Sequence, residues 1–216
     1  MTLAGGTVPS KKIAVLTVIC LIGVMGGGVA AAVTPAPAPV ILTGGLRHHQ
    51  RVFVLGDSIT ALSSTDLAKA LRGHYDYEID GWSGQTIDGQ FPTMTKEVDD
   101  TAAQDWVVEL GTNDLFNGNR QIVEDFDDEV DLLWRQPCVV LVTVSPRLAG
   151  GAALNAAIDG VSRVLPTFHV LDWGTLEYLN PSWVRPDHIH PTAAGSSALA
   201  GFELRALDAC PASSKS

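Results

Sequence analysis

A serine, a histidine and an aspartate are placed in this chain where they could act as a nucleophile, a base and the group that orients the base. Ser58 follows the apolar run Val52–Leu55, and Gly56 lets the backbone turn sharply before the helix that is predicted to begin near Thr60. A serine at a strand-to-helix turn presents its hydroxyl to a cleft, while nearby backbone N–H groups face an anion. Ser58 is therefore a candidate nucleophile, and the alternative is a serine that only caps the helix.

A second candidate is the turn Asp187-His188-Ile189-His190, just before the last predicted helix. An aspartate three residues before a histidine can hold the proton of one ring nitrogen, so that the other nitrogen faces outward as a base. The same turn could instead be half of a metal site through His188, or a capped surface loop. We take His190 as the candidate base and Asp187 as its orienting carboxylate.

Strands and helices alternate along the part of the chain that must position these groups. The apolar patterns predict strands at residues 52–55, 75–80, 105–110, 138–144 and 168–172, and helices from residue 60 and at 87–98, 119–136, 152–165 and 192–207. Such alternation is typical of an α/β fold with a parallel sheet between two layers of helices. Right-handed crossovers place every strand-to-helix loop at one edge of the sheet, so Ser58, Gly84 and Asn113 are expected to meet there.

Four sequence blocks together resemble the SGNH hydrolases, also called GDSL esterases and lipases. The blocks are Gly56-Asp57-Ser58-Ile59, Trp82-Ser83-Gly84, Gly111-Thr112-Asn113-Asp114 and Asp187-x-x-His190-Pro191. The resemblance covers residues 51 to about 208, with Ile59 where the usual family name has leucine. It implies a three-layer α/β/α fold with a five-stranded parallel, flavodoxin-like sheet.

The resemblance also implies a role for each of the matching residues. Ser58 would be the nucleophile, His190 the general base and acid, and Asp187 the carboxylate that orients it. The backbone N–H groups of Ser58 and Gly84 and the side-chain amide of Asn113 would form the oxyanion hole, whose donors stabilise the charge of the tetrahedral intermediate. The resemblance implies neither a cofactor nor a metal ion.

Other residues near the same loops have two interpretations. Trp82, Trp173 and Trp183 could stack on a sugar or hold an acyl chain, or they could fill the space between the loops and the sheet. Asp57 and Asp114 are expected to tie the active loops to backbone amides.

Residues 1–32 have the pattern of an export signal. Lys11 and Lys12 precede an uncharged run from Ile13 to Val33, and Ala30–Ala32 offers a small-residue cleavage site. The alternative is an uncleaved anchor, because the run is just long enough to span a bilayer. We assign residues 33–50 to a stiff Pro/Ala-rich linker, 51–210 to the hydrolase domain and 211–216 to a tail. The expected location is secreted or associated with the cell envelope.

The formal net charge of −10 becomes −12 when the two lysines of the export signal are subtracted. Such an acidic protein is repelled by nucleic acid and by anionic lipid, so neither is an expected partner, and a membrane contact would involve only an uncleaved N-terminal segment. Cys138 and Cys210 could form one disulfide in an oxidising compartment, or remain two buried thiols. Nothing in the sequence favours a particular oligomeric state.

The favoured function is an exported serine esterase that acts on short-chain acyl or lipid esters through an acyl-enzyme. The same triad could instead release acetyl groups from cell-envelope polysaccharide or transfer them to it. A non-catalytic binding module is disfavoured because Ser58, Asn113, Asp187 and His190 are all present. An α/β-hydrolase fits less well because Thr60 stands where its Gly-x-Ser-x-Gly motif needs a glycine.

Overall fold

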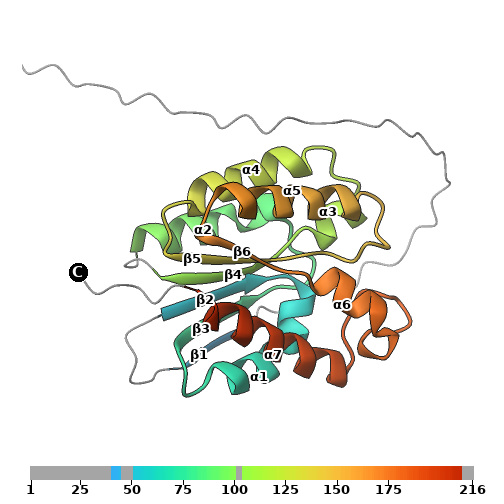
Figure 1. Cartoon of the computed structure of the whole chain (residues 1–216), viewed down its shortest axis with the longest axis horizontal. Helices are drawn as coiled ribbons and strands as arrows, with labels where there is room; N and C mark the ends of the chain where they lie inside the picture. The colour runs from blue at the N-terminus through green and yellow to red at the C-terminus, as the bar shows by residue number, and fades with distance from the viewer. Residues whose placement is uncertain (1–39, 45–50, 101–103, 211–216) are drawn as a thin grey trace, which may run out of the picture. The chain divides into compact units, whose positions relative to one another are not determined.

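In the computed structural model, which describes residues 40–44, 51–100 and 104–210, six strands pair into one sheet in the order β1-β3-β2-β4-β5-β6. Five of these strands run parallel, and β1 pairs with β3 in the antiparallel direction (Figure 1). The parallel strands alone have the flavodoxin-like order, which confirms the predicted sheet. The bounds are β1 (Val40–Gly44), β2 (Arg51–Gly56), β3 (Asp76–Gly81), β4 (Asp105–Glu109), β5 (Cys138–Val142) and β6 (Phe168–Leu171).

The edge strand β1 was not expected, because its residues lie in the predicted Pro/Ala-rich linker, residues 33–50. Val40 lies opposite Gly81 and Gly44 lies opposite Tyr77, so this segment pairs along the length of β3. The ordered sheet therefore begins before residue 51. The predicted export signal and the Pro/Ala repeat fall outside the described residues, and within those residues no helix has the length and hydropathy needed to cross a membrane.

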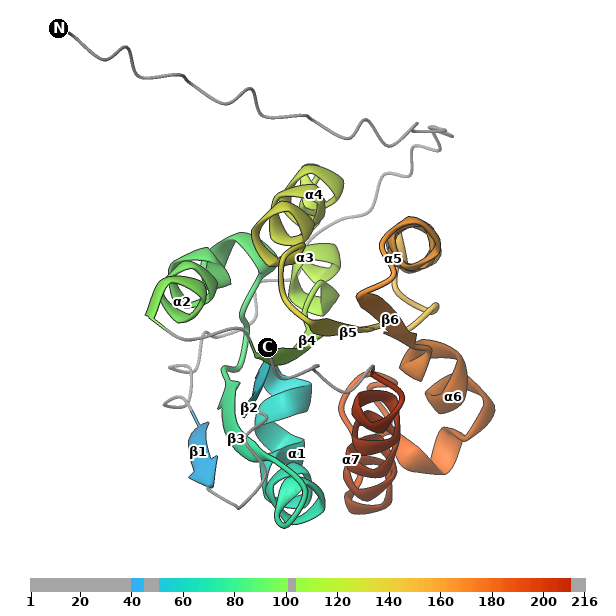
Figure 2. The same ribbon diagram turned by 60° about the vertical axis from the view of Figure 1, so that its left-hand side comes forward.

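Helices cover both faces of the sheet. α1 and α7 pack together on one face, and α2, α4 and α5 lie on the other (Figures 1 and 2). The short elements α3, α6 and η1 occupy segments that the sequence analysis reads as loops, because one or two turns leave no apolar periodicity to detect. The bounds are α1 (Ser58–Leu71), α2 (Ile87–Asp100), α3 (Thr112–Phe116), α4 (Ile122–Leu133), α5 (Gly151–Val164), α6 (Trp173–Leu179), η1 (Pro181–Trp183) and α7 (Ala193–Asp208).

The strands are apolar on both sides because helices bury both faces of the sheet. In β2, Val52 and Val54 belong to the hydrophobic cluster under α1 and α7, while Phe53 and Leu55 belong to the cluster on the opposite face. All four side chains are buried. The continuous apolar run that precedes Ser58 is thus the central strand of the sheet, and it holds the following turn on a rigid support.

A disulfide joins Cys138, at the start of β5, to Cys210, just after α7. The sequence allowed either a disulfide or two buried thiols at these positions, and the structure contains the disulfide. The two Cα atoms are 5.9 Å apart, which is within the usual range for a disulfide. The bond closes a loop with a sequence separation of 72 residues, for which chain entropy predicts a stabilisation of about 4 kcal/mol.

Candidate active site

Ser58, His190 and Asp187 form a chain of hydrogen bonds at the carboxyl edge of the parallel strands. Ser58 is the first residue of α1, directly after β2, and the other two lie in the loop before α7. The Ser58 Oγ lies 3.0 Å from Nε2 of His190, and Nδ1 of His190 lies 2.9 Å from Oδ2 of Asp187. Because an ionised carboxylate only accepts, Nδ1 carries the ring proton and Nε2 is free to accept the Ser58 hydroxyl.

The turn that holds His190 is organised by Asp187. Its Oδ1 accepts hydrogen bonds from the backbone N–H groups of Ile189 and His190, each at 3.0 Å. His188 has a φ of 60°, a left-handed conformation that non-glycine residues adopt at a cost and that tightens the turn. The backbone N–H of Arg185 donates to the carbonyl oxygen of His190 at 2.8 Å and closes the loop. The turn thus aims the ring of His190 at Ser58.

The same hydrogen bonds keep Asp187 ionised. Burial raises the pKa of this carboxyl, but the hydrogen bonds from the His190 ring and from the backbone N–H groups of His190 and Ile189 outweigh burial and lower the pKa to about 2. The side chains of His190 and Asp187 are 33% and 46% exposed. The base is therefore partly accessible from solvent, and its orienting carboxylate stays charged at neutral pH.

Asn113 links the segments that follow three neighbouring strands. Its Nδ2 donates to Oδ2 of Asp57 and to the carbonyl oxygen of Gln85, both at 2.9 Å. Oδ1 of Asp57 accepts the backbone N–H of Ile59 at 2.9 Å and caps α1. Asp57 thus ties the active loop to a backbone amide as predicted, and it also holds Asn113 beside the start of α1.

Two glycines of the predicted motifs are needed for different reasons. Gly84 has a φ of 81°, and a Cβ there would meet nothing within 4 Å, so backbone conformation rather than space requires glycine. At Gly56 a Cβ would lie 1.9 Å from the hydroxyl oxygen of Thr60, so only glycine lets the end of β2 approach α1. The use of the Gly84 N–H as an oxyanion donor stays a prediction.

The three tryptophans that could contact substrate or fill the space between the loops and the sheet differ in exposure. Trp173 is only 2% exposed, so of its two interpretations the structure has the packing one, and its ring offers no face to a substrate. Trp183 stacks on Trp173 at a centroid distance of 5.8 Å, and its ring also packs on Phe202. Only Trp82, which is 36% exposed, keeps a substantial free surface. Alternation of loops and strands does not distinguish these environments, because burial depends on α6 and η1, which the sequence did not predict.

Sequence reasoning missed a group of buried carboxyls beside the start of α1. The Thr60 hydroxyl donates to Oε2 of Glu109, at the end of β4, while Oε1 of Glu109 and both carboxyl oxygens of Glu203 in α7 are buried without a hydrogen-bond partner. Burial raises the pKa of Glu203 to about 8 and that of Asp57 to about 7. Burial, followed by the nearby Glu203, also raises the pKa of Glu109. Glu109, directly after the apolar run Trp106–Val108 in β4, was the available signal.

Replacing Glu203 with glutamine is expected to flatten the pH dependence of stability. The folded protein keeps a proton on Glu203 that the unfolded chain releases, so the stability contributed by Glu203 falls as the pH rises from 4.5 to about 8 and stays lost above that. The amide carries no charge to bury. At about pH 9 the Glu203→Gln variant should therefore be more stable than wild type, by on the order of a few kcal/mol, and near pH 4.5 the two should be similar.

Urea unfolding at these two pH values measures the difference in the free energy of unfolding. Glu124→Gln, on the exposed side of α4, is the matched control and should leave the pH dependence unchanged. An equally steep loss of stability in Glu203→Gln and in wild type would contradict the assignment of a buried, protonated Glu203.

The solved structures most similar in fold include esterases, a lipase and an acetyltransferase domain. The acetylxylan esterase Axe2 from Geobacillus stearothermophilus has a TM-score of 0.62 and 16% identity, covering 74% of this chain and 94% of that chain. The C-terminal catalytic domain of Streptococcus pneumoniae peptidoglycan O-acetyltransferase A has a TM-score of 0.61 and 21% identity, covering 77% and 98%. A GDSL-like lipase from Bacteroides thetaiotaomicron has a TM-score of 0.61 and 20% identity, covering 74% and 88%. No family model and no curated protein matches the chain.

These identities are low, so the similarity concerns the fold. It nevertheless extends over nearly the whole length of each of the three solved chains. The fold is the one that the four sequence blocks predict, and the strand ends that carry the first and third blocks meet through Asn113. The chain therefore has the SGNH hydrolase fold, that of the GDSL esterases and lipases.

Proposed function

We propose that this protein is a serine esterase that hydrolyses carboxylic esters through an acyl-enzyme. The observation that carries the proposal is the hydrogen-bonded chain from Ser58 through His190 to Asp187, with distances of 3.0 and 2.9 Å. Nucleophilic ester hydrolysis needs three groups within hydrogen-bond reach of one another: a nucleophile, a base and a carboxylate that orients the base. The esterases among the similar folds support the same reaction class.

In the proposed mechanism each proton transfer involves a named atom. Nε2 of His190 takes the Ser58 proton as Oγ attacks the ester carbonyl carbon, and the resulting imidazolium is stabilised by the charge of Asp187. The imidazolium then donates its proton to the leaving alcohol, and the acyl group stays on Ser58 as an ester. Water, deprotonated by Nε2, attacks that ester and releases the acid and the free Ser58 hydroxyl.

The proposed oxyanion hole consists of the N–H groups of Ser58 and Gly84 and the amide of Asn113. In the resting structure both N–H groups of Asn113 are already used, one by Asp57 and one by the carbonyl oxygen of Gln85. An oxyanion must therefore compete with one of these two acceptors. Gln85 directly follows Gly84, so both lie in one loop. A small shift of this loop would free the Asn113 amide and at the same time move the Gly84 N–H.

Replacing Asn113 with alanine is expected to lower kcat by about 10² to 10³, the usual effect of removing one oxyanion donor. KM should change much less, because the lost hydrogen bond is strongest in the transition state. Steady-state kinetics on p-nitrophenyl acetate measures both constants. Asn117→Ala, an exposed asparagine just after α3, is the control and should keep wild-type values. A change in KM with an unchanged kcat would show that Asn113 is not an oxyanion donor.

A second candidate function is the release of acetyl groups from envelope polysaccharide, or their transfer to it. Two similar folds favour it, since one is an acetylxylan esterase and another is the catalytic domain of a peptidoglycan O-acetyltransferase. The part-exposed His190 and the exposed Asp187 suit a polymeric substrate, because a third of the His190 side chain is open to solvent. Export, predicted from residues 1–32, would bring the enzyme to such a substrate, and the disulfide is consistent with an oxidising compartment.

A panel of substrates, combined with covalent labelling, tests both functions. A fluorophosphonate probe should modify Ser58, identified by mass spectrometry of the labelled peptide, and p-nitrophenyl acetate and butyrate should be hydrolysed. Acetate release from acetylated xylan and peptidoglycan, with and without an unacetylated glycan acceptor, separates hydrolysis from transfer. A folded protein that neither reacts with the probe nor hydrolyses any of these esters would contradict both functions and leave a non-catalytic module.

A further inference from the structure

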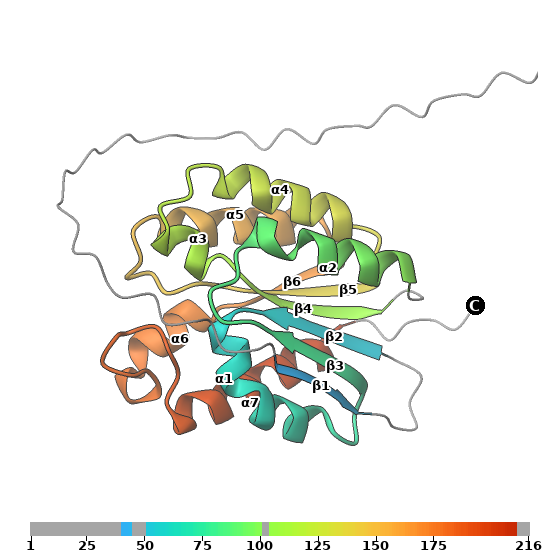
Figure 3. The ribbon, with the colours of Figure 1, turned by 180° about the vertical axis from the view of Figure 1, so that it is seen from behind.

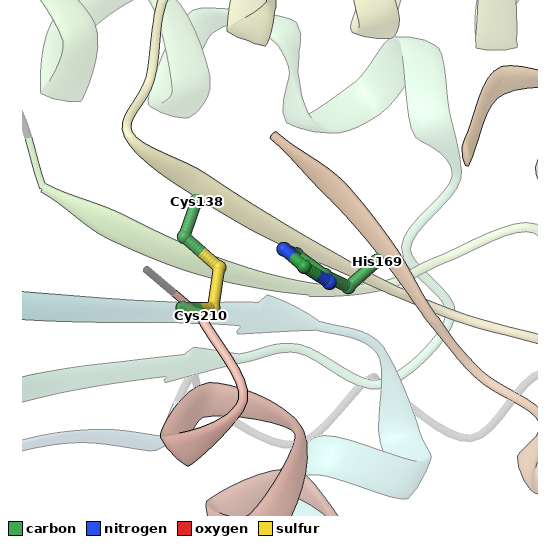
Figure 4. Close-up of side chains that lie close together, drawn as sticks. All are labelled: Cys138, His169 and Cys210. Atoms are coloured by element: carbon green, nitrogen blue, oxygen red, sulfur yellow. A yellow bond between two sulfur atoms is a disulfide. The ribbon is translucent and has the colours of Figure 1, made fainter. Parts of the chain in front are cut away.

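Cys138, His169 and Cys210 form a cluster at the opposite edge of the sheet from Ser58. Cys138 opens β5 and His169 is the second residue of β6, so both lie where the parallel strands begin rather than where they end. One ligand atom from each of the three residues, the two sulfurs and a ring nitrogen, lies within 4.8 Å of the other two. Figure 4 shows the His169 ring extending from β6 toward the disulfide, and Figure 3 shows the two strands from behind.

His169 lies among apolar neighbours that do not satisfy its ring. In the pairing of β5 with β6, His169 lies opposite Val140. Val140 and Cys138 belong to the same hydrophobic cluster, and Cys210 packs against that cluster. The Nε2 atom is buried and has no hydrogen-bond partner. Leaving a buried polar atom unpaired is unfavourable, so Nε2 of His169 is an unused potential ligand beside two sulfurs.

We propose that Cys138, Cys210 and His169 bind one Zn²⁺ ion when the disulfide is reduced. Two thiolates and an imidazole are ligands that zinc prefers, and a water molecule would complete a tetrahedral site. With Zn–S bonds of about 2.3 Å, the two sulfurs of such a site lie about 3.8 Å apart. The Cα atoms of the two cysteines, 5.9 Å apart, allow this separation with side-chain movement alone.

The chemistry of the exchange balances in two steps. A dithiol reductant supplies two electrons and two protons, so the S–S bond becomes two thiols while the reductant closes into its own disulfide. Zn²⁺ then displaces both thiol protons, and neutral His169 binds through Nε2 with its proton on Nδ1. The end of α7 would thus be attached to β5 by a covalent bond in one redox state and by a metal ion in the other. This site is separate from the proposed ester chemistry and does not depend on it.

Zinc titration of the full chain in its two redox states tests the site. The Cys20→Ser background leaves Cys138 and Cys210 as the only thiols. A phosphine reductant, which is oxidised to its oxide with oxygen from water, opens the disulfide without adding a competing thiol. The reduced protein is expected to bind one Zn²⁺ per chain, and the oxidised protein none. Co²⁺ in place of zinc should give the visible absorption of a tetrahedral site and a thiolate charge-transfer band.

His169→Ala keeps both cysteines and isolates the contribution of the imidazole. Changes in groups that only support a metal ligand typically weaken binding by 10- to 100-fold, so loss of a ligand should weaken zinc binding by at least about tenfold. Equal affinity in wild type and in His169→Ala, or equal binding by the oxidised and reduced proteins, would overturn the proposal. If reduction unfolds the chain, far-UV circular dichroism must recover when zinc is added, and a failure to recover would overturn it as well.

Discussion

Ser58→Ala is expected to lower the kcat for ester hydrolysis by on the order of 10⁶, because it removes the atom that carries the acyl group. The remaining activity should exceed that of water alone, since the N–H groups around the site can still stabilise an oxyanion. Binding of substrate should change little, because a hydroxyl hydrogen forms few contacts in the ground state. The effect therefore falls on kcat, and KM should remain close to that of wild type.

Kinetics on p-nitrophenyl acetate and thermal unfolding should be measured on the same preparations. Ser64→Ala is a matched control, since Ser64 lies in the same helix, is equally buried and donates its hydroxyl only to the carbonyl oxygen of Ala61. The control should keep kcat within a small factor of wild type. Activity in Ser58→Ala above a tenth of the wild-type value, in a protein with an unchanged melting temperature, would rule out Ser58 as the nucleophile.

Asp187→Asn should lower kcat by about 10⁴. The asparagine oxygen can still accept the backbone N–H groups of Ile189 and His190, so the turn should keep its shape. Its amide, however, donates to Nδ1 and moves the ring proton of His190 to Nε2. A protonated Nε2 cannot accept the Ser58 proton, so the geometry survives while the base is lost.

The measurement is kcat at neutral pH together with a test that the fold is intact. Asp131→Asn, an exposed aspartate in α4, controls for the loss of one negative charge and should be neutral. An Asp187→Asn variant that retains more than about a tenth of the wild-type kcat would show that the carboxylate does not set the tautomer of His190.

Much of the proposed site was predictable, because short sequence motifs and apolar runs indicate which residues it contains. The apolar run before Ser58 and the spacing of Asp187 and His190 are short-range features. The alternation of strands and helices predicted that Ser58, Gly84 and Asn113 would share one edge of the sheet, and the family resemblance implied that His190 would meet Ser58, which lies within hydrogen-bond reach of it in the structure. The prediction needed no side-chain coordinates, since right-handed crossovers bring all strand-to-helix loops to one edge. The five parallel strands and the long helices followed from the same periodicities.

Contacts between distant residues could not be predicted in this way. The pairing of β1 depends on the free edge of β3, and the burial of Trp173 depends on a short helix that has no periodicity of its own.

The sequence by itself determined which chemistry the chain offers and at which edge of the sheet, because residue types and the alternation of strands and helices are local features of the sequence. Only the tertiary structure showed that Asn113 is already engaged, that Glu203 is buried without a partner and that His169 faces the disulfide. Burial and hydrogen-bond partners are properties of packed side chains from several elements, and no single segment of the sequence contains them.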